Sequence, residues 1–241
     1  MTQSTQASTT QTLPLAEGLR GIVADWSSDQ RAFKKVPWGK AMMWIFLLSD
    51  TFIFSCFLIS YMTVRISTTD PWPNPSEVFA LTVWGHKIPL ILIAIMTFIL
   101  ISSSGTMAMA VKFGYEKNRK VTFILLLITA ALGATFVGMQ AFEWTKLIVD
   151  EGIRPWGNPL GAAQFGSTFF MITGFHGTHV SIGVIFLLIV ATKVIRGDLD
   201  HERPGFMTGR KGKYEIVEIM GLYWHFVDLV WVFIFAVFYL W

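Results

Sequence analysis

Five long apolar stretches, separated by short polar segments, constrain this sequence more than any other feature. They cover about residues 41–64, 88–111, 121–149, 164–195 and 215–241. At a rise of about 1.5 Å per residue, a helix over any of them exceeds the roughly 30 Å hydrocarbon core of a bilayer. We therefore expect an all-α integral membrane protein, built as a bundle of five transmembrane helices.

The composition agrees with this expectation. Charged residues make up 15% of the chain, against about 25% in an ordinary soluble domain, and the mean hydropathy is +0.54. The polar segments are too short to hold a soluble catalytic domain, and they contain no phosphate-binding loop, dinucleotide-binding motif or nucleophile elbow. Nucleic acid is not an expected partner.

The basic residues are distributed unevenly between the two predicted sides of the membrane. Segments 1–40, 112–120 and 193–213 hold five, four and six Lys and Arg residues, whereas the alternate polar segments hold four together. By the positive-inside rule, the N-terminus is cytoplasmic and the C-terminus lies outside. Residues 1–40 are then a polar cytoplasmic arm, and residues 41–241 form the membrane domain.

Ionisable side chains within the spans are candidate functional residues, because a charge in hydrocarbon costs several kcal/mol. The candidates for an intramembrane polar network are Asp50 in the first span, His176 and His179 in the fourth, and His225 and Asp228 in the fifth. Counting helical rise places all but His176 about 14 to 21 Å deep, near the midplane, where a mutual network is feasible. We expect Asp50 to be either protonated or paired with a histidine.

Several interpretations of these polar groups stay open. Glu218, His225 and Asp228 fall on one face of the fifth span, which can meet a cavity, a lipid headgroup or another helix. Interhelical hydrogen bonding is the simplest role. A proton relay through Asp50, a metal or haem site built from the three histidines, and a channel or transporter are the alternatives.

Two further features predict packing. Ala130, Ala134 and Gly138 recur every four residues on the third span, which predicts a close approach of a neighbouring helix. Cys56 is the only cysteine, so an intrachain disulfide is excluded, and we expect it to be a small buried side chain.

The C-terminal run from Tyr223 to Trp231, Tyr-Trp-His-Phe-Val-Asp-Leu-Val-Trp, resembles the signature of subunit III of the haem-copper oxidases. Residues 166–183 and the run from Gln140 to Trp144 are similar to other motifs of that family. In the first span, Leu48-Ser49-Asp50-Thr51 is similar to the family's Ser-Glu element, with Asp50 in place of glutamate. The resemblance covers about residues 38–241 and matches the five-span bacterial form rather than the seven-span mitochondrial one.

The resemblance implies a non-redox subunit of a proton-pumping cytochrome c oxidase in the aerobic electron transport chain of a bacterial inner membrane. Haems and copper are then expected on partner subunits I and II, with no cofactor, metal or catalytic residue on this chain. Subunit III packs on subunit I, binds phospholipid, and supports proton uptake and stable turnover.

Glu143, Glu218 and Trp224 are candidate boundary or lipid contacts. Subunit III of a quinol oxidase and an accessory subunit of a nitric oxide reductase stay open, because the electron donor is recognised on subunit II.

Overall fold

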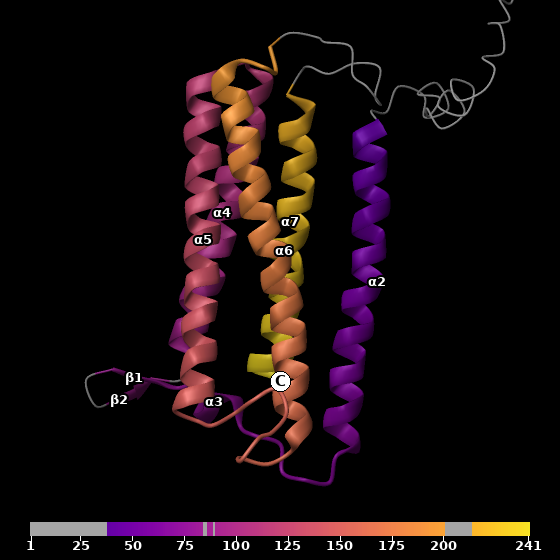
Figure 1. The fold of residues 1–241 in the computed structure, drawn as a ribbon, viewed down its shortest axis with the longest axis vertical. Coiled ribbons are helices and arrows are strands. Elements are labelled where there is room, and N and C mark those ends of the chain that lie inside the picture. The colour runs from indigo at the N-terminus through magenta and orange to yellow at the C-terminus, as the bar shows by residue number, and fades with distance from the viewer. Residues whose placement is uncertain (1–37, 84–85, 89, 201–213) are drawn as a thin grey trace, which may run out of the picture.

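Five long helices make up the described part of the protein, as the computed structural model in Figure 1 shows. The structure describes residues 38–83, 86–88, 90–200 and 214–241, so most of the expected N-terminal arm and the basic segment 201–213 lie outside it. The helices are α2 Trp38–Ser67, α4 Ile91–Tyr115, α5 Arg119–Val149, α6 Ala163–Arg196 and α7 Glu215–Phe235. All five are long and apolar enough to cross a membrane, which confirms the predicted spans.

One departure from the predicted boundaries occurs between α2 and α4. The predicted second span began at residue 88, but His86–Ile88 form a strand, β2, that pairs antiparallel with β1, Leu81–Val83. Helix α4 therefore begins at Ile91, after Leu90 in the left-handed conformation with φ 59°. The prediction of a purely helical protein misses this small hairpin, because three-residue strands carry little periodic signal in the sequence.

Short helical elements also occur outside the five long helices, beginning with the Pro-rich segment before the hairpin. A single short helix, α3 Pro75–Val78, follows Asn74, whose side chain accepts a hydrogen bond from the Ser76 amide. At the far end of the chain, α7 continues as the π-helical turn η1, Ala236–Leu240. These short elements lie at the same end of the bundle in Figure 1.

Helix α2 stands at the edge of the molecule, beside α6 and α7, while α4 to α7 pack together. Only 17% of its most apolar segment is buried, against 56% in the last span. Its inner face docks through aromatic rings, with Phe54 and Phe57 each about 5 Å from Phe175. Cys56 is exposed on α2, so the prediction of a buried thiol is wrong.

Trp224 of α7 packs against glycines on α5 and α6, and these glycines are not part of the predicted stripe of small residues. A Cβ added at Gly133 on α5 would lie 2.5 Å from the Trp224 ring, and one at Gly183 on α6 would lie 2.9 Å from it. Within the stripe, Ala130 is buried, but Ala134 and Gly138 are exposed. The prediction of a close approach along the stripe is therefore wrong at Ala134 and Gly138. Spacing alone does not say which face of a helix is buried.

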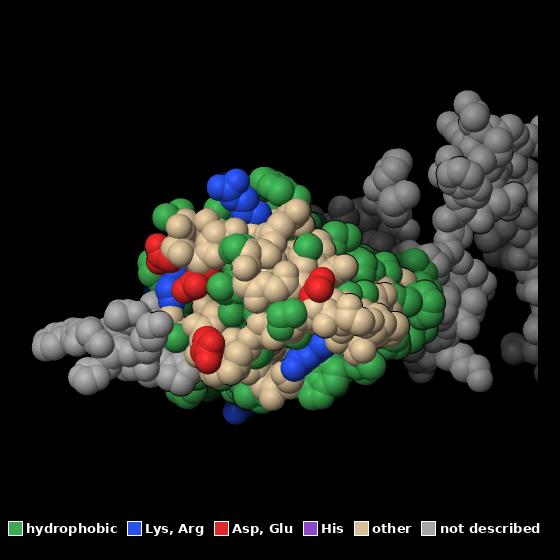
Figure 2. Space-filling model, turned by 90° about the horizontal axis from the view of Figure 1, so that it is seen from below, with side chains coloured by type: hydrophobic (Ala, Val, Ile, Leu, Met, Phe, Trp, Pro, Cys, Tyr) green, Lys and Arg blue, Asp and Glu red, His purple; other side chains and the backbone are tan. Residues whose placement is uncertain are grey.

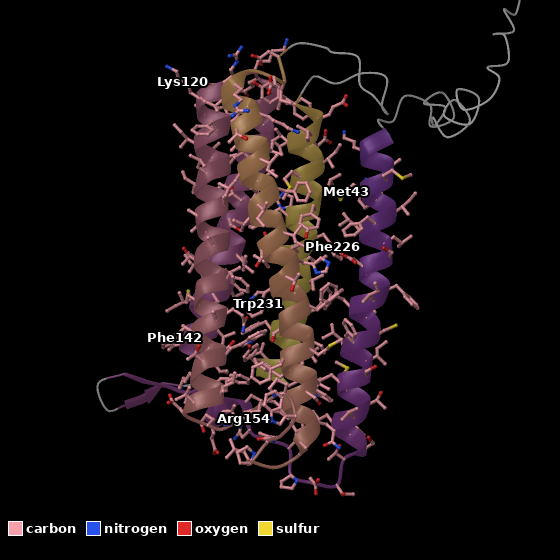
Figure 3. All side chains as sticks on the ribbon, in the orientation of Figure 1. Met43, Lys120, Phe142, Arg154, Phe226 and Trp231 are labelled. Carbon is pink, nitrogen blue, oxygen red and sulfur yellow. The ribbon has the colours of Figure 1, made fainter. Side chains whose placement is uncertain are left out.

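Charged side chains lie at both ends of the bundle. Figure 3 shows Lys120 at one end and Arg154 at the other. At the Lys120 end, Arg119 pairs with Asp200, and the Tyr214 hydroxyl donates to the same carboxylate at 3.0 Å. Burial and the neighbouring Asp200 raise the pKa of Tyr214 to about 12, so this hydroxyl stays protonated as a donor.

Candidate functional site

A buried acid–histidine pair joins α2 to α6. Asp50 Oδ2 lies 3.1 Å from His179 Nε2, which is ion-pair distance, although the contact falls outside hydrogen-bond geometry. Asp50 is 4% exposed, and the rings of Phe54 and Phe175 flank the imidazole at 5.7 and 4.7 Å. Of the two states expected for Asp50, the structure therefore contains the pairing with a histidine.

The hydrogen bond of the second nitrogen of His179 determines how many protons the Asp50–His179 pair holds. Nδ1 is 2.8 Å from the carbonyl oxygen of Phe175, and a carbonyl can only accept, so Nδ1 carries a proton. If Nε2 were bare and Asp50 ionised, two lone pairs would face each other in a site of low dielectric. One more proton must therefore lie between Asp50 and Nε2, either as a neutral acid–imidazole contact or as an ion pair.

The polar residues of α7 contact hydroxyl groups on α4. His225 Nδ1 lies 2.5 Å from Ser104 Oγ, and Asp228, which is 7% exposed, lies beside the same serine without a hydrogen bond of standard geometry. About one helical turn before and after Asp228, the indole N–H groups of two tryptophans donate hydrogen bonds to hydroxyl groups on α4. Trp224 donates to Ser103 at 2.9 Å, and Trp231 donates to Thr97 at 3.0 Å.

The α4 hydroxyls were missed by sequence reasoning. Their signal is the run Ser102-Ser103-Ser104 within an apolar span. Serine and threonine in a membrane helix either bond their own backbone or serve a neighbouring helix, and the sequence does not distinguish these roles. Here Ser103 does both, since it donates to the Leu100 carbonyl and accepts from Trp224.

The single network that depth predicted is divided into two clusters. Among the residues that the structure places, no hydrogen bond or ion pair joins Asp50 or His179 to His225 or Asp228. Helix α7 reaches the first cluster through Tyr223 instead, whose hydroxyl donates to the His179 carbonyl at 2.8 Å. The two clusters lie on different helix interfaces, α2–α6 and α4–α7.

His176 belongs to neither cluster. Its ring stacks on Trp231, with centroids 5.4 Å apart, and meets the edge of Phe136 at 5.9 Å. It is 1% exposed, and neither ring nitrogen has a hydrogen-bond partner. The three histidines do not converge, and in the described ranges no group of three or more His, Cys, Asp or Glu side chains could hold a metal ion.

Two of the three expected boundary residues are buried. Glu143 is 3% exposed, because Gln140 donates to its Oε2 at 2.6 Å and the Tyr239 hydroxyl lies 3.2 Å from each of its oxygens. Trp224 is fully buried in the glycine-lined contact with α5 and α6. These positions correct the expectation that Glu143 and Trp224 contact lipid.

Glu218, the third boundary candidate, lies at the end of the bundle as expected. Its side chain is 28% exposed, pairs with Lys40 at 2.6 Å, and accepts from the Tyr115 hydroxyl. It thereby ties the first turn of α7 to both α2 and α4. A partly exposed pair of this kind contributes about 1 kcal/mol or less to stability.

Comparisons with known proteins give a consistent family. The model of the family described as "Cytochrome c oxidase subunit III" matches residues 28–241. A cytochrome c oxidase subunit 3 of Alkalihalophilus pseudofirmus is 30% identical over 197 residues, covering 82% of this chain and 84% of the relative. A probable quinol oxidase subunit 3 of Staphylococcus aureus is 31% identical over 203 residues, covering 83% and 88%.

Proposed function

Because this chain belongs to the cytochrome c oxidase subunit III family, we propose that it is the non-redox subunit III of a proton-pumping terminal oxidase in aerobic respiration. In this proposal the haems and copper lie on subunits I and II, and this chain packs against subunit I. The observation that carries the proposal is the family match over residues 28–241, which includes all five spans and every polar cluster described above.

The positions of the three intramembrane histidines support a role in holding the helices together rather than in binding a metal or haem. Each intramembrane histidine has its own environment: His179 contacts Asp50, His225 contacts Ser104, and His176 stacks on Trp231. These contacts connect helices, and they leave no set of imidazoles facing one centre. A bundle stabilised in this way provides a rigid surface for a catalytic subunit.

Support of proton uptake and binding of phospholipid complete the proposal. The Asp50–His179 pair shares a proton deep in the bundle, which makes it the group on this chain best suited to respond to proton movement nearby. We further propose a bacterial inner membrane location, with the N-terminus cytoplasmic and the C-terminus outside, on the basis of the uneven basic segments.

Cytochrome c is the proposed electron donor of the complex, and quinol is the second candidate. Quinol is kept as a candidate because a relative in Staphylococcus aureus, 31% identical to this chain, is named a probable quinol oxidase subunit 3. The donor is decided by a partner subunit, so this chain serves either enzyme with the same fold.

Affinity purification of the tagged chain from native membranes in mild detergent tests the proposal. We expect haem-copper oxidase subunits I and II to co-purify, identified by mass spectrometry. The complex should oxidise reduced cytochrome c, or quinol in the second case, with oxygen uptake inhibited by cyanide. Isolation of the chain without oxidase subunits, or a haem absorption band from the chain expressed alone, would contradict it.

A further inference from the structure

The imidazole of His225 reaches the surface of the bundle between α4 and α7. Its Nδ1 contacts Ser104 of α4. Its Nε2 has no hydrogen-bond partner among the described residues and, unlike both nitrogens of His176, is not buried. Helical rise places His225 about 15 Å from Glu215, the first residue of α7, which is halfway through a hydrocarbon core of roughly 30 Å. An imidazole nitrogen therefore faces outwards at mid-membrane depth.

This depth decides what can pair with Nε2. The Ser104 hydroxyl can donate to Nδ1 or accept from it, so Nε2 is correspondingly a donor or an acceptor. A polar group that faces acyl chains without a hydrogen bond costs free energy. Headgroups lie instead at the ends of the bundle, and Figure 2 shows Asp, Glu, Lys and Arg side chains on the end that carries the β1–β2 hairpin. The partner of Nε2 must then come from a neighbouring transmembrane helix.

The surface around His225 suits a close contact between helices. Ala108 follows Ser104 by one turn on the same face of α4, and both Ala108 and Gly105 are exposed. A Cβ added at Gly105 would have no atom within 4 Å. On α7, Leu229 follows His225 by one turn and is 54% exposed. We call these five residues, Ser104, Gly105, Ala108, His225 and Leu229, the α4–α7 surface. Small residues of this kind let a second backbone approach closely.

A buried acid lies behind the α4–α7 surface. Asp228 is 7% exposed and lies beside Ser104, and neither of its carboxyl oxygens has a hydrogen bond of standard geometry. The Ser104 hydroxyl is thus placed between His225 and Asp228 and cannot satisfy all their polar atoms. Within the described part of the chain, this cluster has more hydrogen-bonding groups than partners, and a polar side chain from outside would correct the imbalance.

We propose that the α4–α7 surface is the docking site for a transmembrane helix of a partner subunit. That helix places a hydroxyl, amide or carboxyl side chain against His225 Nε2, and its backbone lies against Gly105 and Ala108. Small residues and interhelical hydrogen bonds together are the usual means by which helices associate in lipid. The partner's identity as an oxidase subunit rests on the proposed function, whereas the docking face and the chemistry of the contact rest on the residues of this chain.

Enlarging Gly105 tests the close contact. Gly105→Leu adds a side chain where this chain has no atom nearby, so the bundle itself should fold as the wild type does, whereas a docked helix would be displaced. Gly138→Leu on α5 is the matched control, because a Cβ there also meets no atom within 4 Å. The readout is the amount of this chain that co-purifies with tagged subunit I in mild detergent. We expect Gly105→Leu to lower that amount at least about tenfold, since overpacking of a helix contact weakens binding by this order. Gly138→Leu should leave it unchanged.

Two substitutions of His225 test the hydrogen bond. His225→Phe removes both ring nitrogens and should lower co-purification several-fold. His225→Gln keeps a donor and an acceptor, so it should stay close to the wild type. Ser104→Ala removes only the contact within this chain and should also stay close to the wild type. A photoreactive amino acid in place of Leu229 should cross-link, in native membranes, to a transmembrane segment of a partner subunit, and mass spectrometry identifies that segment.

Four outcomes would overturn the proposal. The first two are unchanged co-purification of Gly105→Leu and an equal loss in Gly138→Leu. The third is a loss in Ser104→Ala as large as that in His225→Phe, which would give His225 a role only within this chain. The fourth is cross-linking from position 229 to lipid alone. If the wild-type chain does not co-purify with oxidase subunits, the proposed function fails instead, and the cross-link from position 229 to a transmembrane segment of another protein still decides whether this face docks a helix.

Discussion

Asp50 and His179 meet across the α2–α6 interface with 3.1 Å between carboxylate Oδ2 and imidazole Nε2, while the Phe175 carbonyl already occupies Nδ1 of the same ring. This relationship requires a proton between the two side chains. It also adds a buried polar contact to the aromatic rings through which α2 docks. Because α2 is the least buried of the five spans, we expect loss of this pair to weaken its attachment.

Two substitutions of Asp50 should show whether the stability of the complex depends on its hydrogen-bonding ability or on its charge. In Asp50→Asn the amide N–H can donate to Nε2, so we expect assembly close to that of the wild type. In Asp50→Leu the imidazole nitrogen loses its partner, at a cost of roughly 1 to 3 kcal/mol. Thermal dissociation of the subunit from the purified complex measures the difference. Equal stability of the two variants would show that Asp50 has no buried partner.

Two glycines on α5 should respond differently to alanine. Gly133→Ala places a Cβ 2.5 Å from the Trp224 ring, and forced overpacking of this kind costs typically about 1 to 3 kcal/mol. Gly138 has no atom within 4 Å of the added Cβ. Gly138→Ala should be neutral or stabilise the helix by up to about 1 kcal/mol, as measured by thermal unfolding in detergent.

A smaller ring at position 224 supplies the control for this pair. Combining Gly133→Ala with Trp224→Phe should recover part of the loss, because the shorter ring leaves room for the methyl group. If Gly138→Ala destabilises the protein as much as Gly133→Ala does, the contact with Trp224 is not the cause.

The last turn of the protein should depend on Glu143. Tyr239 on η1 points its hydroxyl at both oxygens of this buried carboxyl group, so Tyr239→Phe should increase hydrogen exchange in residues 236–240 by several-fold. Glu143→Leu should have the same local effect. In the double variant the two effects should not add, since residues in contact are coupled. Additive effects would show that the two side chains act independently.

The number of spans, and their limits to within four residues, followed from hydropathy and helical rise. Depth counting placed Asp50 level with His225 and Asp228, and near His179, because position along a straight helix depends only on residue number. Hydropathy and helical rise do not say how each helix is rotated about its own axis, and this rotation decides which neighbouring helix a side chain meets. Asp50 meets His179 while His225, at a similar depth, meets Ser104 on another helix.

The same limit explains the errors at Glu143 and Trp224. Glu143 lies near the end of its span, whereas Trp224 precedes His225 at mid-membrane depth, and both side chains turn into the bundle. The partners that bury them, Tyr239 and the pair Gly133 and Gly183, come from other helices. A residue's burial in a bundle depends on such tertiary contacts, which local patterns do not encode.

Two histidines one helical turn apart should show opposite responses to phenylalanine. His176 stacks on Trp231 with both nitrogens unbonded, and replacing an unsatisfied polar group by an apolar ring of similar shape is neutral or stabilising. His179→Phe should destabilise the protein instead, because it leaves Asp50 buried without its partner. We expect the thermal stability of the complex to be kept or raised by His176→Phe and lowered by His179→Phe. A loss of stability in His176→Phe as large as that in His179→Phe would contradict the role of His176 as a stacked, unbonded ring.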